Sequence, residues 1–192
     1  MIRAFVAIEL PQNLKPAVLQ LIENLQGLPN SDLIRWVKPQ AFHLTLVFLG
    51  DVDSKRIPDL SSSLQAAASV NLPFQTSLAG MGAFPNWSRP RVLHLEIADP
   101  AGRLTALQHS VQSELEPLGF EPERRPFTPH LTLGRARNGV GRGALERLVQ
   151  HVQQVELPGT PAWSITDINL IQSDLRPTGP VYTTLASLRL GS

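Results

Sequence analysis

The sequence contains no cysteine, which excludes several classes of protein at the outset. Without thiols the chain can form no disulfide, no zinc-thiolate or iron-sulfur site and no cysteine nucleophile. Charged residues are also few, at 17% of the chain, and 17 Lys and Arg nearly balance 16 Asp and Glu. This balance gives no strong overall attraction to nucleic acid and lacks the charge excess of disordered chains. The composition therefore predicts an ordinary folded protein, and we expect it in the cytoplasm.

Long hydrophobic runs are absent as well. The apolar stretch near the amino terminus is bounded by Arg3 and Glu9, which makes it too short for a signal-peptide core or a membrane span. It is typical of a strand that starts a fold. A chain of 192 residues is long enough for one well-buried domain, or for two small lobes that share a core. We expect one domain over residues 1–192, a monomer, and no membrane partner.

What the sequence does contain is an internal repeat. The tetrapeptide His-Leu-Thr-Leu occurs at residues 43–46 and again at residues 130–133. The copies lie in two halves, roughly 1–85 and 86–192, whose hydrophobic patterns predict the same order of strands and helices. The repeat predicts an α+β fold of two lobes related by a pseudo-twofold axis. In this fold two antiparallel sheets face one another across a central groove, and the helices lie outside.

The predicted elements of the two halves correspond one to one. Those of the first half are a strand over 4–8, a helix with the stripe Leu14, Val18, Leu21 and Leu25, a helix over 57–68 and a strand over 74–81. Those of the second half are a strand over 92–97, a helix with the stripe Leu104, Leu107, Val111, Leu115 and Leu118, a helix over 144–154 and a strand over 164–171. A final strand over 182–190 follows a turn-forming segment at 176–180, and loops are predicted over 26–39, 82–90 and 119–126.

Each tetrapeptide carries a histidine and a threonine on one face of a strand. Because side chains alternate along a strand, His43 and Thr45 project to one side and their apolar neighbours project to the core. These neighbours are Phe42, Leu44, Leu46 and Phe48. The same parity puts His130 and Thr132 together. One copy would be weak evidence, because such a histidine is usually a hydrogen-bonded structural residue. Two copies at equivalent places predict that both pairs converge across the groove.

Two histidines and two threonines suit the chemistry of a phosphodiester. Histidine titrates near neutrality, so one neutral imidazole can accept a proton while a protonated one donates. Threonine hydroxyls are short neutral donors for the non-bridging oxygens of a phosphate. The alternative is a metal site, but the residue two positions after each histidine is threonine rather than a carboxylate or a second histidine, which matches no usual ligand spacing. We therefore expect no metal and no other cofactor.

The residues around the tetrapeptides extend the pattern over nearly the whole chain. Trp-Val-Lys-Pro at 36–39 precedes the first copy, and Phe-Thr-Pro-His-Leu-Thr-Leu-Gly-Arg at 127–135 contains the second. Gly-Ala-Phe-Pro at 82–85 and Arg-Pro-Arg-Val-Leu at 89–93 lie between them. In this order the segments resemble the bacterial and archaeal RNA 2',3'-cyclic phosphodiesterases. This branch of the two-histidine phosphoesterase superfamily was historically called the 2'-5' RNA ligases.

The resemblance implies a bilobal fold that hydrolyses a terminal 2',3'-cyclic phosphate of RNA to a 2'-phosphate without a metal. It implies that His43 is the general acid for the ribose 3'-oxygen and that His130 is the general base for water. Thr45 and Thr132 would hold the phosphate. The identical tetrapeptides leave the reverse assignment of acid and base open. Weak reversible 2'-5' ligation of RNA is an implied side activity.

Two alternative functions remain open. One is a related enzyme of the superfamily, such as a hydrolase of ADP-ribose cyclic phosphate, an exonuclease or a ligase. The other is a protein that binds RNA ends without catalysis. This second alternative is disfavoured because both histidines and both threonines are present, and a binding protein has little need of two imidazoles.

Arg135 matches the arginine that follows the second motif in the resembled family, where it would contact the phosphate. Strict alternation from His130 puts Arg135 on the core face, so this role requires an irregularity. Gly134 allows a bulge, and the strand can also end there.

Four further residues are predicted to line the substrate groove. Phe5 and His94 occupy corresponding places in the two halves, opposite the aliphatic residues of their strands, and we expect both to form groove wall. Phe84 and Trp87 lie in a loop that the repeat places beside the groove. Of the aromatic residues, these two are predicted to stack on an RNA base.

Overall fold

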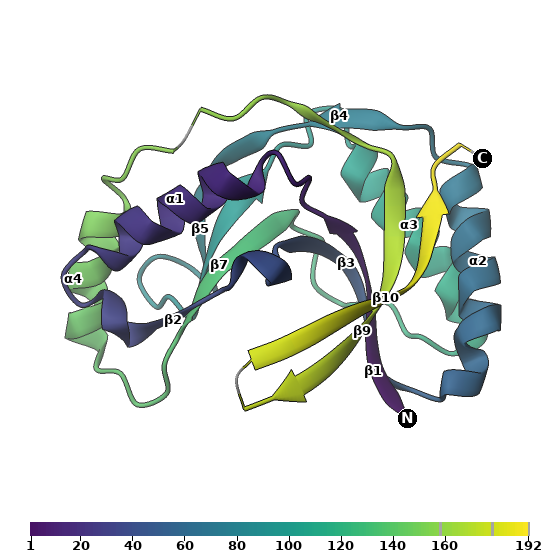
Figure 1. The fold of residues 1–192 in the computed structure, drawn as a ribbon, viewed down its shortest axis with the longest axis horizontal. Helices are drawn as coiled ribbons and strands as arrows, with labels where there is room; N and C mark the ends of the chain where they lie inside the picture. The colour runs from purple at the N-terminus through teal and green to yellow at the C-terminus, as the bar shows by residue number, and fades with distance from the viewer. Residues whose placement is uncertain (158, 178, 192) are drawn as a thin grey trace.

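The computed structural model describes residues 1–157, 159–177 and 179–191, and Figure 1 shows its helices and strands. The first half contains β1 (Ile2–Glu9), α1 (Lys15–Gln26), β2 (Ile34–Trp36), β3 (His43–Val52), α2 (Ile57–Ser69), β4 (Phe74–Thr76) and β5 (Leu78–Phe84). The second contains β6 (Val92–Ile97), α3 (Arg103–Leu115), β7 (His130–Ala136), α4 (Arg142–Val152), β8 (Trp163–Ile165), β9 (Asp167–Arg176) and β10 (Gly179–Arg189). The predicted order of strands and helices is confirmed in both halves.

The apolar stripes form the buried faces of α1 and α3. A proline in the first turn starts α1, where its missing N–H costs no hydrogen bond. The carboxylate of Asp99 accepts hydrogen bonds from the backbone N–H groups of Leu104 and Thr105, at 2.9 and 3.0 Å. These bonds satisfy amides that have no partner within the first turn of α3. Local chemistry thus fixes where both helices begin.

The strands of both halves join in one eight-stranded sheet. Its order is β10-β9-β1-β3-β7-β6-β5, with β2 paired to β7 beside this path, and β4 and β8 form a separate two-stranded sheet. The predicted pair of sheets facing one another is therefore wrong. Instead, the two sets of strands meet edge to edge at β3 and β7, where Leu44 pairs with Leu131. These leucines belong to the two tetrapeptides, so the junction brings the motifs themselves together.

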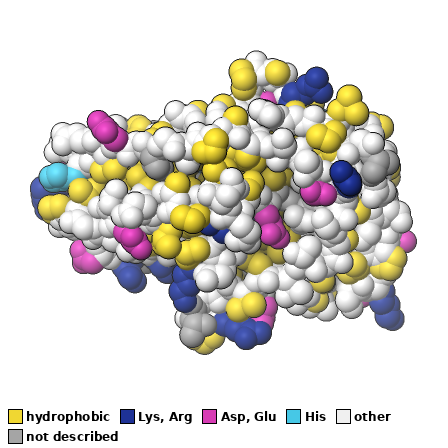
Figure 2. Space-filling view, turned by 45° about the horizontal axis from the view of Figure 1, so that its top comes forward, with side chains coloured by type: hydrophobic (Ala, Val, Ile, Leu, Met, Phe, Trp, Pro, Cys, Tyr) yellow, Lys and Arg dark blue, Asp and Glu magenta, His cyan; other side chains and the backbone are white. Residues whose placement is uncertain are grey.

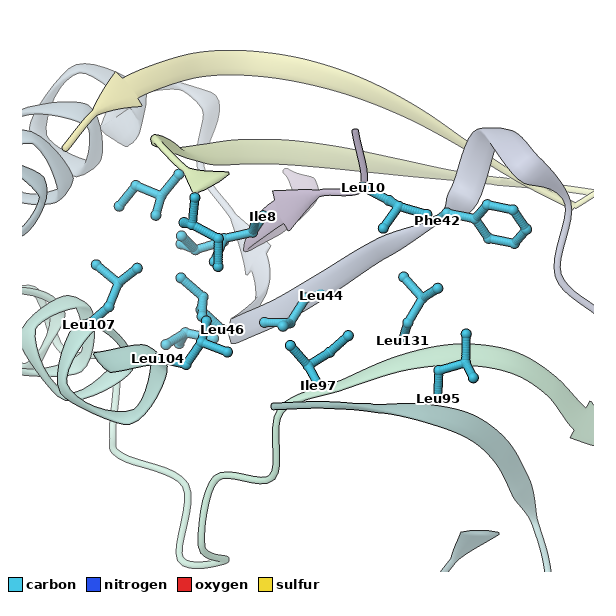
Figure 3. Packing of buried hydrophobic residues seen from close by; sticks show 14 of the residues in the cluster. Ile8, Leu10, Phe42, Leu44, Leu46, Leu95, Ile97, Leu104, Leu107 and Leu131 are labelled. Carbon is cyan, nitrogen blue, oxygen red and sulfur yellow. The ribbon is translucent and has the colours of Figure 1, made fainter. Parts of the chain in front are cut away.

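One apolar cluster underlies this junction and includes residues of both halves. Figure 3 shows Leu44 of β3 and Leu131 of β7 beside Ile97 of β6, with Leu104 and Leu107 of α3 packed in the same core. All five side chains are buried. The apolar residues of the tetrapeptides thus pack in the core. Their packing holds in place the strands that carry the histidines.

The halves also exchange strands. β5 of the first half pairs with β6, and β9 of the second half pairs with β1. Figure 1 shows α2 and α3, one from each half, side by side. Each half therefore completes the sheet and the helical layer of the other.

Some predicted loops differ in the structure. The loop predicted over 26–39 contains β2, which pairs with β7. The loop predicted from Gly82 begins later, because β5 continues through Phe84. The predicted turn over 176–180 joins β9 to β10, but Thr178 lies outside the described residues.

On the face shown in Figure 2, Lys and Arg side chains are spread in separate groups with acidic side chains among them. None of the helices within the described ranges has the length and apolar character needed to cross a membrane.

Candidate active site

Each tetrapeptide presents its polar side chains on the face opposite its leucines. Leu44 and Leu131 are buried, whereas His43, Thr45, His130 and Thr132 are all half-buried. Within the described part of the chain, neither threonine hydroxyl has a hydrogen-bond partner. Two imidazoles and two available hydroxyl donors therefore lie on strands that meet at the junction of the sheet.

A β-bulge in β3 changes the face of the residues that follow the first motif. Thr45 pairs with Ala7 and Val47 pairs with Val6, so Leu46 is an extra residue in β3. Beyond the bulge the parity is reversed, and the ring of Phe48 lies on the side of the sheet that carries His43. The prediction that Phe48 projects into the core is wrong, because strict alternation does not allow for the extra residue.

The same irregularity occurs in β7. Gly134 pairs with Leu93 and Thr132 pairs with His94, so Leu133 is the extra residue. Leu133 and Gly134 are both buried, and the exposed Arg135 follows on the side of His130. The sequence allowed either a bulge near Gly134 or the end of the strand there, and the structure has the bulge.

Gly134 is required here by close approach rather than by its backbone angles. A Cβ atom at this position would lie 2.4 Å from Cγ2 of Ile34, in the neighbouring β2. The absence of a side chain therefore allows β2 to pack directly against the bulged segment of β7.

The imidazole of His43 is enclosed by two aromatic rings. Its centroid lies 4.8 Å from that of Phe5 and 5.1 Å from that of Tyr182, whose ring is nearly perpendicular to it. Tyr182 comes from β10, which the repeat does not contain, so the sequence offered no way to place it.

The imidazole of His130 has an equivalent pair of neighbours. Its centroid lies 5.2 Å from that of His94 and 4.8 Å from that of Phe84. His94 and Phe84 stack face to face at 4.1 Å. The structure thus brings Phe5, His94 and Phe84 against the two motif histidines. Trp87 instead packs against the hydrophobic core.

Backbone carbonyl groups orient both motif histidines. Nδ1 of His130 lies 2.8 Å from the carbonyl oxygen of Thr128, two residues earlier. A carbonyl only accepts, so Nδ1 carries the hydrogen and Nε2 is left for a substrate. His43 makes the same kind of bond with the carbonyl group of Ala41, also two residues earlier.

Burial and neighbouring charge lower the pKa of both motif histidines, which favours their neutral forms. Burial lowers the pKa of His43 to about 4, the bond to Ala41 opposes this, and the charges of His130 and Arg135 lower it further. Burial also lowers the pKa of His130, against the bond to Thr128 and together with the charge of Arg135. Arg135 thus lies close enough to act on both imidazoles, and a bound anion would offset its effect.

His94 is a third imidazole at the site and is more deeply buried, with 3% of its surface exposed. Its Nδ1 has no hydrogen-bond partner among the described residues. Burial, with a smaller effect of the charge of His130, lowers its pKa to about 4. Gly82 on the paired strand leaves room for its ring, because a Cβ atom there would lie 2.3 Å from Nε2. His94 is thus a neutral ring that packs against His130.

A pocket of about 180 Å³ opens beside His43. Its lining residues are Glu9, Lys15, Gln40, Phe42, His43, Ile171, Tyr182 and Thr184. In the ranges that the structure describes, no cluster of three or more His, Asp or Glu side chains is arranged to hold a metal ion.

Comparison with known proteins gives one consistent picture. Residues 11–177 match the model of the 2'-5' RNA ligase superfamily. An RNA 2',3'-cyclic phosphodiesterase of Methanothermobacter thermautotrophicus is 32% identical over 189 residues, which cover 98% of this chain and 99% of the relative. One of Aquifex aeolicus is 34% identical over 158 residues and 82% of each chain.

Solved structures agree over the whole chain. The protein TT0787 of Thermus thermophilus superposes with a TM-score of 0.81 and 26% identity, over 99% of this chain and 98% of that one. LigT of E. coli in complex with 3'-AMP superposes with a TM-score of 0.77 and 26% identity, over 100% and 99%.

Proposed function

The chain belongs to the 2'-5' RNA ligase superfamily, and from that premise we propose that it is an RNA 2',3'-cyclic phosphodiesterase. The reaction opens a terminal 2',3'-cyclic phosphate to a 2'-phosphate. The observation that carries the proposal is the meeting of β3 and β7, which brings His43, Thr45, His130 and Thr132 to one site with Arg135. Relatives that carry this activity in their names support it.

In the proposed mechanism, His130 takes a proton from water as the water oxygen forms a bond to phosphorus. The bond between phosphorus and the ribose 3'-oxygen breaks on the opposite side, and His43 gives its proton to that oxygen. Each imidazole is held by a backbone carbonyl group, so its free nitrogen has a fixed direction. The reverse assignment of acid and base fits the same geometry.

Thr45, Thr132 and Arg135 would hold the non-bridging oxygens of the phosphate. The two hydroxyls are neutral donors, so they stabilise negative charge without altering the proton balance between the histidines. The guanidinium supplies charge-assisted hydrogen bonds to the same oxygens. The bulge at Leu133 supports this role, because it places Arg135 on the reacting side of β7.

Substrate binding would also prepare the general acid. Burial lowers the pKa of His43 to about 4, so this imidazole is neutral at neutral pH. A cyclic phosphate carries one negative charge, and an anion close to an imidazole raises its pKa. We infer that the bound substrate promotes the protonation of His43 that its own cleavage requires.

Hydrolysis in this mechanism needs no metal, and the donor set of two imidazoles, two hydroxyls and a guanidinium resembles no usual metal site. With a 5'-hydroxyl RNA in place of water, the reverse reaction would form a 2'-5' linkage.

We further propose that residues 1–192 act as one bilobal unit with a pseudo-twofold axis near the Leu44–Leu131 pair. A monomer suffices for this, because all the proposed groups come from one chain.

The test is turnover of an RNA that ends in a 2',3'-cyclic phosphate, in the presence of EDTA, with chromatographic separation of the products. A 2'-phosphate product is expected. A 3'-phosphate as the sole product, or no turnover, would overturn the proposal. ADP-ribose cyclic phosphate in a parallel assay separates the related hydrolase, and binding of RNA ends without any turnover identifies the non-catalytic alternative.

A further inference from the structure

Two arginines lie directly opposite one another on the reacting side of the sheet. Arg35 of β2 pairs with Arg135 of β7 in the antiparallel register. Residues opposite one another in such a pair lie on the same face of the sheet, with Cβ atoms about 5 Å apart. Ile34 and Trp36, on either side of Arg35, pack with the hydrophobic core. Arg35 therefore projects to the other face, together with Arg135.

These two guanidinium groups have no neutralising partner. Both side chains are exposed, and within the part of the chain that the structure describes neither forms a hydrogen bond or an ion pair. Like charges directly opposite one another destabilise a strand pair. Arg3 of β1 shows the favourable arrangement, since it lies opposite Asp51 of β3. The pair of arginines thus destabilises the sheet until an anion binds beside it.

The short strand β2 fixes the position of Arg35. Gly134 leaves room for this strand, because a Cβ atom there would lie 2.4 Å from Cγ2 of Ile34. The backbone N–H of Val37 donates a hydrogen bond of 2.9 Å to the carbonyl group of Leu133, the extra residue of the bulge in β7. The bulged segment that brings an arginine of β7 to the reacting side therefore also holds Arg35 beside it.

We propose that Arg35 binds the phosphodiester on the 5' side of the terminal nucleotide. The inference rests on the proposed function and deepens it, because it makes an RNA of at least two nucleotides the preferred substrate.

The order of the strands divides the work between the two arginines. Arg135 is on the strand of His130, and its charge acts on both motif histidines, so it serves the cyclic phosphate. Arg35 lies one strand further from His130. The next anion along an RNA chain is the internal phosphodiester, and a guanidinium matches the oxygen atoms of a phosphate in charge and geometry. Two neighbouring cations therefore suit two successive phosphates of one RNA.

The test uses three substrates that end in the same 2',3'-cyclic phosphate. They are a nucleoside 2',3'-cyclic phosphate, a dinucleotide with its natural internal phosphodiester, and the same dinucleotide with an uncharged methylphosphonate linkage. Arg35→Gln should lower kcat/KM on the natural dinucleotide about ten-fold, mainly through KM, because one hydrogen-bonded contact with a charged group is lost. On the other two substrates this variant should match the unaltered protein.

Two further variants serve as controls. Arg35→Lys keeps the positive charge and should retain most of the preference for the natural dinucleotide. Arg147→Gln removes the same charge from an exposed position on α4 and should leave kcat/KM unchanged on all three substrates.

Equal kcat/KM of Arg35→Gln and the unaltered protein on the natural dinucleotide would overturn the inference. An equal loss on all three substrates would also overturn it, since Arg35 would then act on the cyclic phosphate itself or on the fold.

A binding measurement separates this inference from the proposed function. The ligand is a natural dinucleotide that ends in a 2'-phosphate, so no turnover is needed. For Arg35→Gln, the slope of log Kd against log salt concentration should be smaller by about 0.7, the value for one phosphate contact of a single strand. If the unaltered protein hydrolyses none of the three substrates, the proposed function fails, whereas the smaller slope would still support the phosphate contact. An unchanged slope would contradict it.

Discussion

Arg135 lies on the same face of β7 as His130, although strict alternation would place the two side chains on opposite faces. The extra residue Leu133 reverses the parity between them. The consequence is electrostatic as well as geometric, since the charge of Arg135 lowers the pKa of both motif histidines. A single bulge thus brings Arg135 to the side of His130, and the charge of Arg135 lowers the pKa of both imidazoles.

Replacing Arg135 by glutamine should therefore have two effects. Loss of a charge-assisted donor to the phosphate is expected to lower kcat/KM by about 100-fold. Loss of the positive charge should raise the pKa of His43 and His130, because their protonated forms are no longer repelled. The pH profile of kcat/KM should shift to higher pH. Turnover measured from about pH 4 to pH 9 checks both effects.

Arg147→Gln is the matched control for Arg135→Gln. It removes the same charge from an exposed position on α4. Its profile should coincide with that of the unaltered protein. If Arg135→Gln lowers activity without moving the profile, the guanidinium is not coupled to the histidines in the way described.

The two threonines should contribute through their hydroxyls rather than their methyl groups. Thr45→Val and Thr132→Val keep the shape of the side chain and remove one donor each. We expect each to lower kcat about 10- to 100-fold, because a donor to the developing charge is lost. Thr→Ser at the same positions keeps the donor and should retain most activity. Steady-state kinetics of the four variants distinguish these results, and a fully active valine variant would exclude that threonine as a phosphate donor.

A substrate with a good leaving group should identify the general acid. p-Nitrophenolate leaves without protonation, so an acid is dispensable with bis(p-nitrophenyl) phosphate but a base is still needed. His43→Ala should therefore keep a larger fraction of the unaltered rate on this compound than on cyclic-phosphate RNA. His130→Ala should lose activity on both. The opposite pattern would assign the acid to His130.

His94 should make the folded protein less stable in acid. Its pKa is about 4 when folded and near 6.5 when unfolded, so the unfolded chain binds the proton first as the pH falls. Stability linked to this group is complete above about pH 6.5 and is lost between there and pH 4. His94→Phe removes this loss and places a ring like that of Phe5 at the equivalent position. The free energy of unfolding of the variant, relative to that of the unaltered protein, should increase by on the order of 1–2 kcal/mol as the pH falls from 7.5 to 4.5.

Urea denaturation at the two pH values measures this gain. His109→Gln, at an exposed position on α3, is the control and should show a much smaller change. A stability difference between His94→Phe and the unaltered protein that is the same at both pH values would contradict a neutral, buried His94.

Sequence reasoning predicted much of the secondary structure because apolar periodicity reflects local burial. The stripe of α3 illustrates this, since Leu104, Leu107, Val111 and Leu115 are all buried. The motif histidines were also found from sequence, because a repeated tetrapeptide marks equivalent places whatever the exact topology. The edge-to-edge joining of the strands was missed, since pairing partners far apart in the chain leave no local pattern.

The bulges account for most of the remaining differences. Strict alternation placed Phe48 on the wrong face of its strand and left the face of Arg135 open. The reason is that the position of an extra residue depends on how the strand pairs with its partner strand. Tyr182 was missed because β10 has no counterpart in the first half of the chain. Side chains that reach the site from outside the repeat can be placed only in three dimensions.

The most direct test of the account is single-turnover cleavage of cyclic-phosphate RNA by His43→Ala and His130→Ala, with RNA-end binding measured in parallel. General acid-base catalysis contributes about 10²- to 10⁴-fold, so each variant should lose that much in rate while it still binds a 2'-phosphate end. Cleavage by either variant at the rate of the unaltered protein would contradict a mechanism that divides proton transfer between these two histidines.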